Sequence, residues 1–399
     1  MTTIWGVLLC IAGLGYVARL ASWAVGFQRE ARRTDALEAD DRLPTITVVV
    51  PARDEEETIG PCVDSILAMD YPADRLEIIV VDDDSSDRTA ERVRQRMRAT
   101  PALAGPVLED DESEGEGQLR LVQVPENRRR DRAHKKRAIE KAVIHARGEI
   151  ILTTDADCVV PAMWARSMAA QFEGPEIAFV SGPVTFEVRP EDGLFVRLQA
   201  LDFFGVMACG AGGIGVGRPS LANGACVGYR RETFEALGGF SGIDHVTSGD
   251  DELLMQKVAY GTPLDVRFCS DPRALVVTEP VRDVHAFVHQ RKRWASKSAN
   301  YPPSLKWMLA GVAAFMVPLV ATMIAAPFVP GLRVWLAVAL ALKAIGDLSV
   351  LVPAARRFGL EPLLAAYPIH LVVHAPQALL AFLLGPWGGF EWKGRQLDQ

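Results

Sequence analysis

The sequence lacks the motifs of several large enzyme classes. Neither a glycine-rich dinucleotide fingerprint nor a phosphate-binding P-loop follows the first predicted strand, which disfavours a nicotinamide enzyme and a nucleoside triphosphatase. The 6 cysteines are scattered, without the spacing of a zinc site or a thioredoxin-like motif, and we interpret them as reduced core residues. Basic residues are not in excess, because the net charge is -7, and this argues against a nucleic-acid partner.

Charged residues are almost absent from four stretches of the chain. Each stretch approaches the roughly 20 residues that an α-helix needs to cross a bilayer. The stretches are residues 4–27, 308–329, 332–352 and 362–384. We therefore predict an integral, multi-pass membrane protein. Its predicted parts are an N-terminal transmembrane helix in residues 1–28, a C-terminal region of two to three spans in residues 306–386, and a tail, residues 387–399.

Basic residues predict the orientation in the membrane. Arg29, Arg32 and Arg33 directly follow the first stretch, and positive residues favour the cytoplasmic side. Arg356 and Arg357 fit the same orientation. The first stretch lacks a basic n-region and a clear cleavage site, so we interpret it as an anchor rather than a signal peptide. We expect the large polar part to be cytoplasmic, at the cell (inner) membrane.

The last apolar stretch has three interpretations. It contains His370, His374 and Pro376, and polar groups at membrane depth are costly unless they face protein or water. The stretch is a full span, a bent re-entrant segment or an interfacial helix. These alternatives place the run Trp392-Lys393-Gly394-Arg395 on different sides of the membrane.

The charged middle of the chain alternates between strand-like and helix-like patterns. Apolar, β-branched runs predict strands at residues 46–50, 76–81, 119–124 and 149–154. Helices are predicted at residues 56–69, 88–98 and 134–146. This alternation indicates an α/β fold of Rossmann-like type with a largely parallel sheet. Such sheets bind ligands beyond the carboxyl ends of their strands.

Acidic residues follow two of these predicted strands. Asp82 and Asp83 end one strand, and Asp155 and Asp157 follow another. Side chains two apart on an extended segment point to the same side, so both carboxylates of the second pair can meet one divalent cation that holds a diphosphate. Taken alone, Asp155-Ala156-Asp157 fits a solvated loop start better. Acidic residues at independent strand ends favour a shared crevice, where Asp82 or Asp83 can accept a hydrogen bond from a base N–H.

Six short motifs occur in order between Val48 and Trp294. They are Val50-Pro51-Ala52-Arg53-Asp54-Glu55-Glu56, Val80-Val81-Asp82-Asp83-Asp84-Ser85, Lys135-Lys136, Asp155-Ala156-Asp157, Ser248-Gly249-Asp250-Asp251 and Gln290-Arg291-Lys292-Arg293-Trp294. With apolar segments after them, the chain resembles the family-2 inverting glycosyltransferases, the group that includes cellulose, chitin and hyaluronan synthases and ceramide glucosyltransferase. The resemblance implies a nucleotide-sugar-binding GT-A-type catalytic domain, expected over residues 44–300.

The resemblance also implies which residues bind the donor. Those that would hold or flank its nucleoside are Ala52, Glu55, Asp82 or Asp83, and Lys136. Asp54 stands where the family more often has Asn, which leaves its contact open. Asp157 would bind Mg²⁺ or Mn²⁺ directly, and Asp155 would contact the metal or the sugar and ribose.

The pair Asp250 and Asp251 has two compatible interpretations. By resemblance, Asp251 is the general base that removes a proton from the acceptor hydroxyl. By position, both acids suit the N-terminus of a helix predicted at residues 252–259. Two interpretations also apply to Gln290, Arg293 and Trp294. They contact the diphosphate and an acceptor sugar ring, or they anchor the chain at the membrane interface.

Other segments give weaker signals. Residues 194–207 are apolar on a helical stripe, which fits an acceptor channel at the membrane surface or an ordinary core helix. The glycine-rich segment 205–217 is expected to be flexible. The acidic run 109–116 predicts a surface loop. The basic run 128–137 predicts electrostatic help at the site or a solvated face near the membrane.

These observations predict a membrane-bound inverting glycosyltransferase that uses a divalent metal and a nucleotide-diphospho-sugar, with UDP as the expected nucleotide. Few segments follow Trp294 to build a conduit, so we favour a single transfer to a lipid-type acceptor over a glycan polymer. The run Trp392-Lys393-Gly394-Arg395 resembles the ending of bacterial lipid- or carotenoid-type relatives. The alternatives are a processive polysaccharide synthase and a non-enzymatic nucleotide-sugar-binding scaffold.

Overall fold

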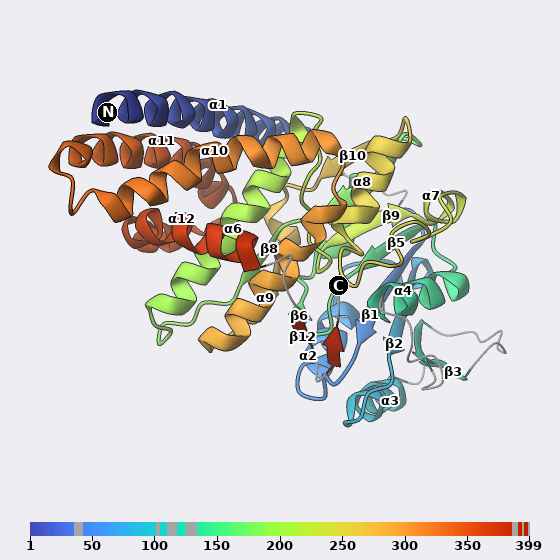
Figure 1. The fold of residues 1–399 in the computed structure, drawn as a ribbon. Coiled ribbons are helices and arrows are strands. Elements are labelled where there is room, and N and C mark those ends of the chain that lie inside the picture. The colour runs from blue at the N-terminus through green and yellow to red at the C-terminus, as the bar shows by residue number, and fades with distance from the viewer. Residues whose placement is uncertain are drawn as a thin grey trace. The chain divides into compact units, whose positions relative to one another are not determined.

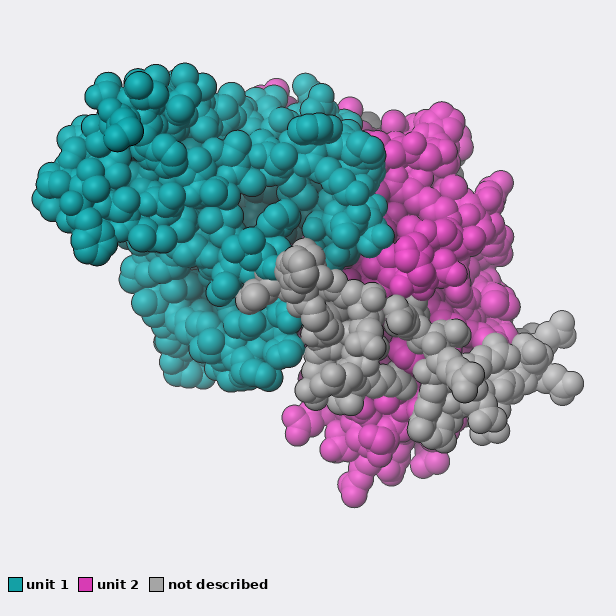
Figure 2. Space-filling model, viewed as in Figure 1, with its two compact units in different colours: residues 1–30, 186–221, 280–390 teal, residues 31–185, 222–279, 391–399 magenta. Residues whose placement is uncertain are grey.

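The computed structural model describes residues 1–35, 43–100, 104–109, 118–124, 134–384, 390–392 and 395–397. Most of the predicted acidic loop, the first part of the basic run, and Lys393 and Gly394 lie outside these residues. The chain forms two compact units (Figure 2). Unit 1 comprises residues 1–30, 186–221 and 280–390, and unit 2 comprises residues 31–185, 222–279 and 391–399. The predicted domain boundaries, with a catalytic domain over residues 44–300, stay predictions.

Unit 2 is built on an eight-stranded sheet (Figure 1). Its order is β10-β7-β9-β5-β1-β2-β4-β3. The strands are β1 (Ile46–Ala52), β2 (Leu76–Asp82), β3 (Ala104–Glu109), β4 (Leu119–Gln123), β5 (Ile150–Thr153), β7 (Ile177–Ser181), β9 (Val227–Arg230) and β10 (Asp265–Phe268). Strand β9 is antiparallel to β5 and β7, and the other paired strands are parallel. The predicted α/β class and largely parallel sheet are confirmed.

The central strands are buried on both faces, as their continuous apolar runs predict. Residues Val48 to Val50 and Ile78 to Val81 are fully buried. Helix α4 (His134–His145) packs on β1 and β2, and α3 (Thr89–Ala99) packs on β4 and on α2 (Ile59–Leu67). Helix α2 begins at Ile59, later than predicted, and the N–H groups of Glu55 and Glu56 before it donate to the side chains of Thr89 and Asp87.

Smaller elements complete unit 2 and the C-terminal segment. A three-stranded sheet has the order β6-β11-β8, formed by β6 (Cys158–Val159), β8 (Val184–Phe186) and β11 (Val276–Thr278). The remaining helices are α5 (Trp164–Ala170), α7 (Arg231–Ala236) and α8 (Glu252–Gly261), with 3-10 turns at Ala73–Arg75 and Pro272–Ala274. Strands β12 (Phe390–Trp392) and β13 (Arg395–Leu397) pair with each other.

Unit 1 consists mainly of helices. They are α1 (Thr2–Asp35), α6 (Leu194–Gly215), α9 (Val284–Ser296), α10 (Pro303–Ala325), α11 (Arg333–Phe358) and α12 (Tyr367–Leu384), with 3-10 turns at Lys297–Asn300, Pro330–Leu332 and Glu361–Ala366. Within the described residues, 5 helices are long and apolar enough to cross a membrane: α1, α6, α10, and α11 and α12 with the turns before them. They indicate membrane association. The four predicted apolar stretches are therefore helical, and α6 is a fifth candidate span.

Helix α6 corrects one prediction. The glycine-rich segment after Met207 was expected to be flexible, but the helix continues to Gly215. A Cβ atom on Gly212 would lie 2.4 Å from the carbonyl oxygen of Trp23, and one on Gly215 would lie 2.0 Å from that of Gly26. Small residues are favoured where two apolar helices pack backbone to backbone. The glycines are therefore interhelical contacts between α6 and α1.

Candidate active site

The predicted donor-site residues of unit 2 lie at one edge of the sheet. Strand β1 is paired with β5 on one side and with β2 on the other, and its last residue, Ala52, is opposite Asp82. All three strands are parallel, so the segments that follow them leave the sheet at the same edge. Asp83 is the first residue after β2, and Asp155 is the second residue after β5. The predicted convergence of strand ends is therefore present in the fold.

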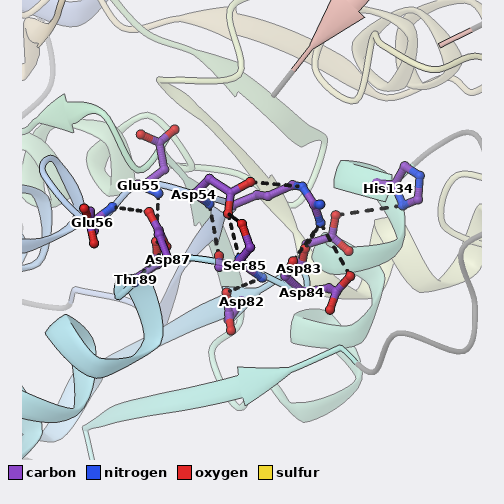
Figure 3. A network of polar contacts seen from close by, with 12 residues as sticks. Asp54, Glu55, Glu56, Asp82, Asp83, Asp84, Ser85, Asp87, Thr89 and His134 are labelled. Carbon is purple, nitrogen blue, oxygen red and sulfur yellow. Dashed lines mark hydrogen bonds and ion pairs between the residues drawn. The ribbon is translucent and has the colours of Figure 1, made fainter. Parts of the chain in front are cut away.

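Two loops at this edge are joined by a network of polar contacts (Figure 3). Asp54 has a positive φ of 49° and accepts hydrogen bonds at Oδ1 from the backbone N–H and the hydroxyl of Ser86, at 2.8 and 3.1 Å. Its own N–H donates to Ser85 Oγ at 3.0 Å. The contact that the sequence left open for Asp54 is thus a bond between the loops after β1 and β2. A residue in the left-handed region must be held by such contacts.

The same network fixes the backbone around Asp83. Arg53 Nη1 donates to the carbonyl oxygens of Asp83 and Asp84, at 2.5 and 2.9 Å. Among the described non-glycine residues, Asp84 is the second with positive φ, at 58°. The Asp83 N–H donates to the Ala52 carbonyl oxygen at 2.9 Å. These bonds hold the main chain of the two strand ends in one conformation.

The side chains of Asp82 and Asp83 are both nearly buried. Asp82 accepts from Gln123 Nε2 at 3.2 Å and from the Ser85 N–H at 3.3 Å. Asp83 lies 3.7 Å from Arg137 Nη2 and 3.9 Å from His134 Nδ1 (Figure 3 draws the latter). Glu55, also predicted to bind donor, accepts from the Thr58 hydroxyl at 2.8 Å. Each predicted nucleoside contact therefore sits in a defined polar environment at the sheet edge.

Lys135 joins two motifs that lie far apart in the sequence. Its ammonium group lies 2.6 Å from Asp155 Oδ1 and 2.9 Å from Asp250 Oδ2. Burial by itself would lower the pKa of Lys135, but the carboxylates of Asp155 and Asp250 raise it above its usual range. Lys135 is therefore a fixed positive charge among acidic groups.

Lys136 has a different environment from its neighbour. Its side chain is 1% exposed. Its ammonium group donates to the carbonyl oxygens of Ile243, Val246 and Ser248, at 2.6, 2.8 and 3.0 Å. An ammonium group has three N–H donors, and these carbonyls use all of them. With these bonds Lys136 holds the loop before Asp250, and its predicted place beside the nucleoside stays a prediction.

Asp251 both caps a helix and faces Gly224. Its Oδ1 accepts from the Glu252 N–H at 2.6 Å at the start of α8, as the capping interpretation predicts. Its Oδ2 accepts from the Gly224 N–H at 2.8 Å. A Cβ atom on Gly224 would lie 2.9 Å from Lys135 Nζ and 3.1 Å from Asp250 Oδ2, so a larger residue would crowd this cluster. The sequence singled out neither Gly224 nor the bridge made by Lys135; the Asn-Gly step and the adjacent basic pair were the available signals.

Asp155, Asp157 and Cys158 form a group whose ligand atoms lie within 4.8 Å of one another. The Cys158 thiol contacts Asp157 Oδ1 at 3.4 Å. Burial, followed by the charge of Asp157, raises the pKa of Cys158 well above its usual value. The two carboxylates of this group supply oxygen ligands. Such oxygen ligands fit Mg²⁺ or Mn²⁺.

Gln290, Arg293 and Trp294 lie on α9 in unit 1. The ring of Trp294 lies 5.5 Å from that of Phe203, and the Arg291 guanidinium lies 4.5 Å from the Trp294 ring. Arg291, which the sequence did not single out, is 8% exposed and is paired with Asp202. The contacts predicted for Gln290, Arg293 and Trp294 with the donor and acceptor stay predictions.

Comparison with known proteins identifies related chains. Two family models match: "Glycosyl transferase family 2" over residues 47–237 and "Glycosyl transferase family group 2" over residues 150–382. The beta-monoglucosyldiacylglycerol synthase of Synechocystis sp. is 28% identical over 261 residues, which cover 63% of this chain and 47% of that protein. The glycosyltransferase AglE of Haloferax volcanii is 25% identical over 209 residues, covering 52% and 59%. The chain thus spans about half the length of these curated relatives.

A solved structure shares the fold over nearly the whole chain. The mannosyltransferase PcManGT from Pyrobaculum calidifontis, in complex with GDP-Man and Mn²⁺, has a TM-score of 0.55 and 25% identity, and the match covers 95% of this chain and 99% of that one. The sheet that gathers the acidic residues is accordingly of the GT-A-like type. The second family model spans more than half of the 399 residues. The chain therefore belongs to glycosyl transferase family 2 and is a glycosyltransferase.

Proposed function

We propose that this glycosyltransferase moves a sugar from a nucleoside-diphosphate donor to a hydroxyl group of a lipid-type acceptor, with inversion at the anomeric carbon. The observation that carries the proposal is the bridge from Asp155 through Lys135 to Asp250. It brings the donor-side acids and the acid pair at the start of α8 into one cluster. A general base beside a donor site is what a single displacement requires.

A divalent cation fits the donor side. Asp157 would bind it directly, and Asp155, which is shared with Lys135, would contact the cation or the sugar. Carboxylate oxygens suit Mg²⁺ and Mn²⁺, and the similar mannosyltransferase was solved with Mn²⁺. When bound, such a cation offsets the charge that develops on the leaving diphosphate. Lys135 supplies a second, permanent positive charge near the same place.

The strand ends of β1 and β2 are suited to hold the nucleoside. Asp82 and Asp83 are carboxylates at the sheet edge that can accept from base N–H or ribose O–H groups. Glu55 and Ala52 lie on the adjacent loop and strand end. A uracil or a guanine base satisfies this chemistry, and both occur on nucleoside-diphosphate sugars. We retain a UDP-sugar as the expected donor, with GDP-mannose, the ligand named for the similar mannosyltransferase, as the first alternative to assay.

Asp251 is the proposed general base. A sugar or lipid hydroxyl is a poor nucleophile at neutral pH, and a carboxylate within hydrogen-bond reach assists its attack. The two hydrogen bonds from Gly224 and Glu252 fix the orientation of this carboxylate. Attack on the anomeric carbon opposite the leaving diphosphate breaks the sugar–phosphate bond in one step and inverts the configuration.

A lipid acceptor is favoured by the five long apolar helices and by the name of the Synechocystis relative, a glycolipid synthase. The rival is processive synthesis of a polysaccharide. Purified protein in lipid, supplied with donor, separates the two: a ladder of oligomers would replace the single-transfer proposal. We keep the cell membrane and a cytoplasmic active site as the proposed location.

The decisive experiment replaces Asp251 with Asn. Asn caps a helix as well as Asp does, so the bond from the Glu252 N–H is preserved, while the base and the bond from the Gly224 N–H are lost. Transfer should fall by about 10²- to 10⁴-fold, with donor affinity unchanged in calorimetry. Asp250→Asn is the matched control, because it retains the Asp251 carboxylate, and it should lose less activity. Unchanged turnover in Asp251→Asn would refute the base assignment.

A screen of nucleotide-sugars, carried out before the variants are assayed, identifies the donor. Nucleotide release is measured from UDP- and GDP-sugars with Mg²⁺ or Mn²⁺, with and without lipid extract. Release that requires both cation and extract supports a lipid-type acceptor. No release from any donor would contradict the proposal as a whole.

A further inference from the structure

A second polar cluster lies within unit 1, among its apolar helices. Asp202 on α6 and His370 on α12 are 7% and 6% exposed. His374, one helical turn after His370, faces the same carboxylate. Ionisable groups on candidate spans are costly to bury and are commonly functional. Both histidines face a protein group, Asp202, as polar residues within an apolar stretch are expected to do.

Another buried acid in unit 1, Asp347, has hydrogen-bond partners on both carboxylate oxygens. Asp347 on α11 accepts from Tyr16 at 2.5 Å and from Tyr367 at 3.1 Å, and it is also bonded to Lys343. Its neighbours are all at hydrogen-bonding distance. Asp202 Oδ1 instead lies 3.5 Å from His370 Nε2 and 3.7 Å from His374 Nε2. Both distances exceed the usual 2.7–3.2 Å of an N–H···O bond.

The ring nitrogens of His370 independently indicate that a further group binds beside Asp202. Among the described residues, neither of its ring nitrogens has a hydrogen-bond partner, although the side chain is more than nine-tenths buried. Buried polar groups without partners are rare in folded proteins, and an ion is one of the recognised explanations. The Nε2 atom of this ring is directed at the same Asp202 oxygen as that of His374.

We propose that Asp202, His370 and His374 bind a Zn²⁺ ion. Two nitrogens and one oxygen, each about 2.0–2.2 Å from a tetrahedral Zn²⁺, are roughly 3.3–3.6 Å apart. The two distances from Asp202 Oδ1 to the histidine nitrogens are close to these ligand–ligand separations. All three ligand atoms lie within 4.8 Å of one another. Histidines four apart on one helix, with a carboxylate from another element, are a common ligand set.

Two further residues hold Asp202 in the orientation that this site needs. Arg291 Nη2 lies 2.9 Å from Asp202 Oδ2, and Gln377 Nε2 donates to the same oxygen at 3.3 Å. Oδ2 is therefore used by these groups, while Oδ1 faces the histidines. Partners of this kind fix the orientation of a ligating carboxylate. Arg291 is itself held between the rings of Phe287 and Trp294, at 4.8 and 4.5 Å.

The site differs from the donor site in its ligands and in its place in the chain. It contains two imidazoles and one carboxylate from α6 and α12, whereas the donor site offers carboxylates after β5. Imidazole nitrogen favours Zn²⁺ over Mg²⁺. Three protein ligands leave one position for water. The ion would join α12 to α6.

The test measures metal binding by the full chain purified in detergent. After chelation and reloading with Zn²⁺, elemental analysis should find one tightly bound ion in the wild type and in Asp157→Asn. His370→Gln and His374→Gln should each weaken Zn²⁺ binding at least 10-fold. The matched control is His289→Gln, in the pair His285 and His289 on α9, whose facing nitrogens lie 3.2 Å apart. It should bind Zn²⁺ like the wild type.

A second measurement needs no variant of the cluster. Co²⁺ replaces Zn²⁺ and reports its ligands in the visible spectrum, so wild type and Asp157→Asn should both show the bands of a nitrogen-ligated, four-coordinate ion. Equal Zn²⁺ affinity in wild type and His374→Gln would overturn the proposal. Absence of the Co²⁺ bands in Asp157→Asn would do so as well, even if the histidine variants fail to fold.

Discussion

The two units contain acidic residues in very different environments. In unit 2, Asp155, Asp157, Asp250 and Asp251 gather at one sheet edge with Lys135 among them. In unit 1, Asp202 and Asp347 are buried apart, each with its own basic partner, Arg291 or Lys343. Like charges held close together oppose folding, whereas a buried acid with a full set of partners supports it. Asp347, with partners on both carboxylate oxygens, is kept for structure, whereas the clustered acids of unit 2 and Asp202, the proposed Zn²⁺ ligand, are kept for binding or catalysis.

Removal of a proposed cation ligand tests the binding side of this comparison. Asp157→Asn removes the proposed direct cation ligand, and a loss of about 3 kcal/mol in transition-state stabilisation lowers transfer roughly 10²-fold. The unfolding midpoint should stay the same or rise, because one of several like charges is gone. Transfer assays and thermal unfolding in detergent measure the two quantities. A clear fall in the midpoint would show that this acid is structural.

The next effect tests the structural side. Asp347→Asn leaves Lys343 buried without its counter-charge, which should destabilise unit 1 by about 3–5 kcal/mol. The double variant Lys343→Met with Asp347→Asn is the control, since it removes both charges and keeps an acceptor oxygen for the tyrosine hydroxyls, which costs less than removing one charge. Thermal unfolding of both variants in detergent measures the difference. Equal destabilisation by the single and double changes would contradict the pairing argument.

The smallest effect compares two adjacent lysines in unit 2. Lys136→Met removes three hydrogen bonds to carbonyl oxygens and should destabilise the protein by about 3 kcal/mol. Lys135→Met should mainly reduce transfer, because Lys135 is the cation among the site carboxylates. Unfolding midpoints and initial rates of transfer are compared for the pair. If Lys136→Met lowers donor affinity at an unchanged midpoint, the residue belongs beside the nucleoside as the sequence predicts.

Several features of the fold could be predicted because they depend on local patterns. The apolar runs ending at Ala52, Asp82 and Thr153 are strands, and parallel pairing brings their ends to one edge. Strands β3, β7, β9 and β10 of the eight-stranded sheet were not predicted. Strand β9, which contains Gly228, is short and lies between β5 and β7, antiparallel to both. No local sequence pattern specifies this pairing. The length of α6 was also missed, because glycine lowers helix propensity while favouring close helix packing.

The class of fold, the apolar helices and the acids that gather at the sheet edge follow from the sequence, because burial periodicity and strand-end chemistry are local properties. The packing of the folded chain sets which of two adjacent lysines enters the acidic cluster, since that depends on which side of α4 each faces. It alone brought Asp202 to His370 and His374, from helices more than 150 residues apart. Contacts at such separations follow from how the helices pack, and no single segment encodes them.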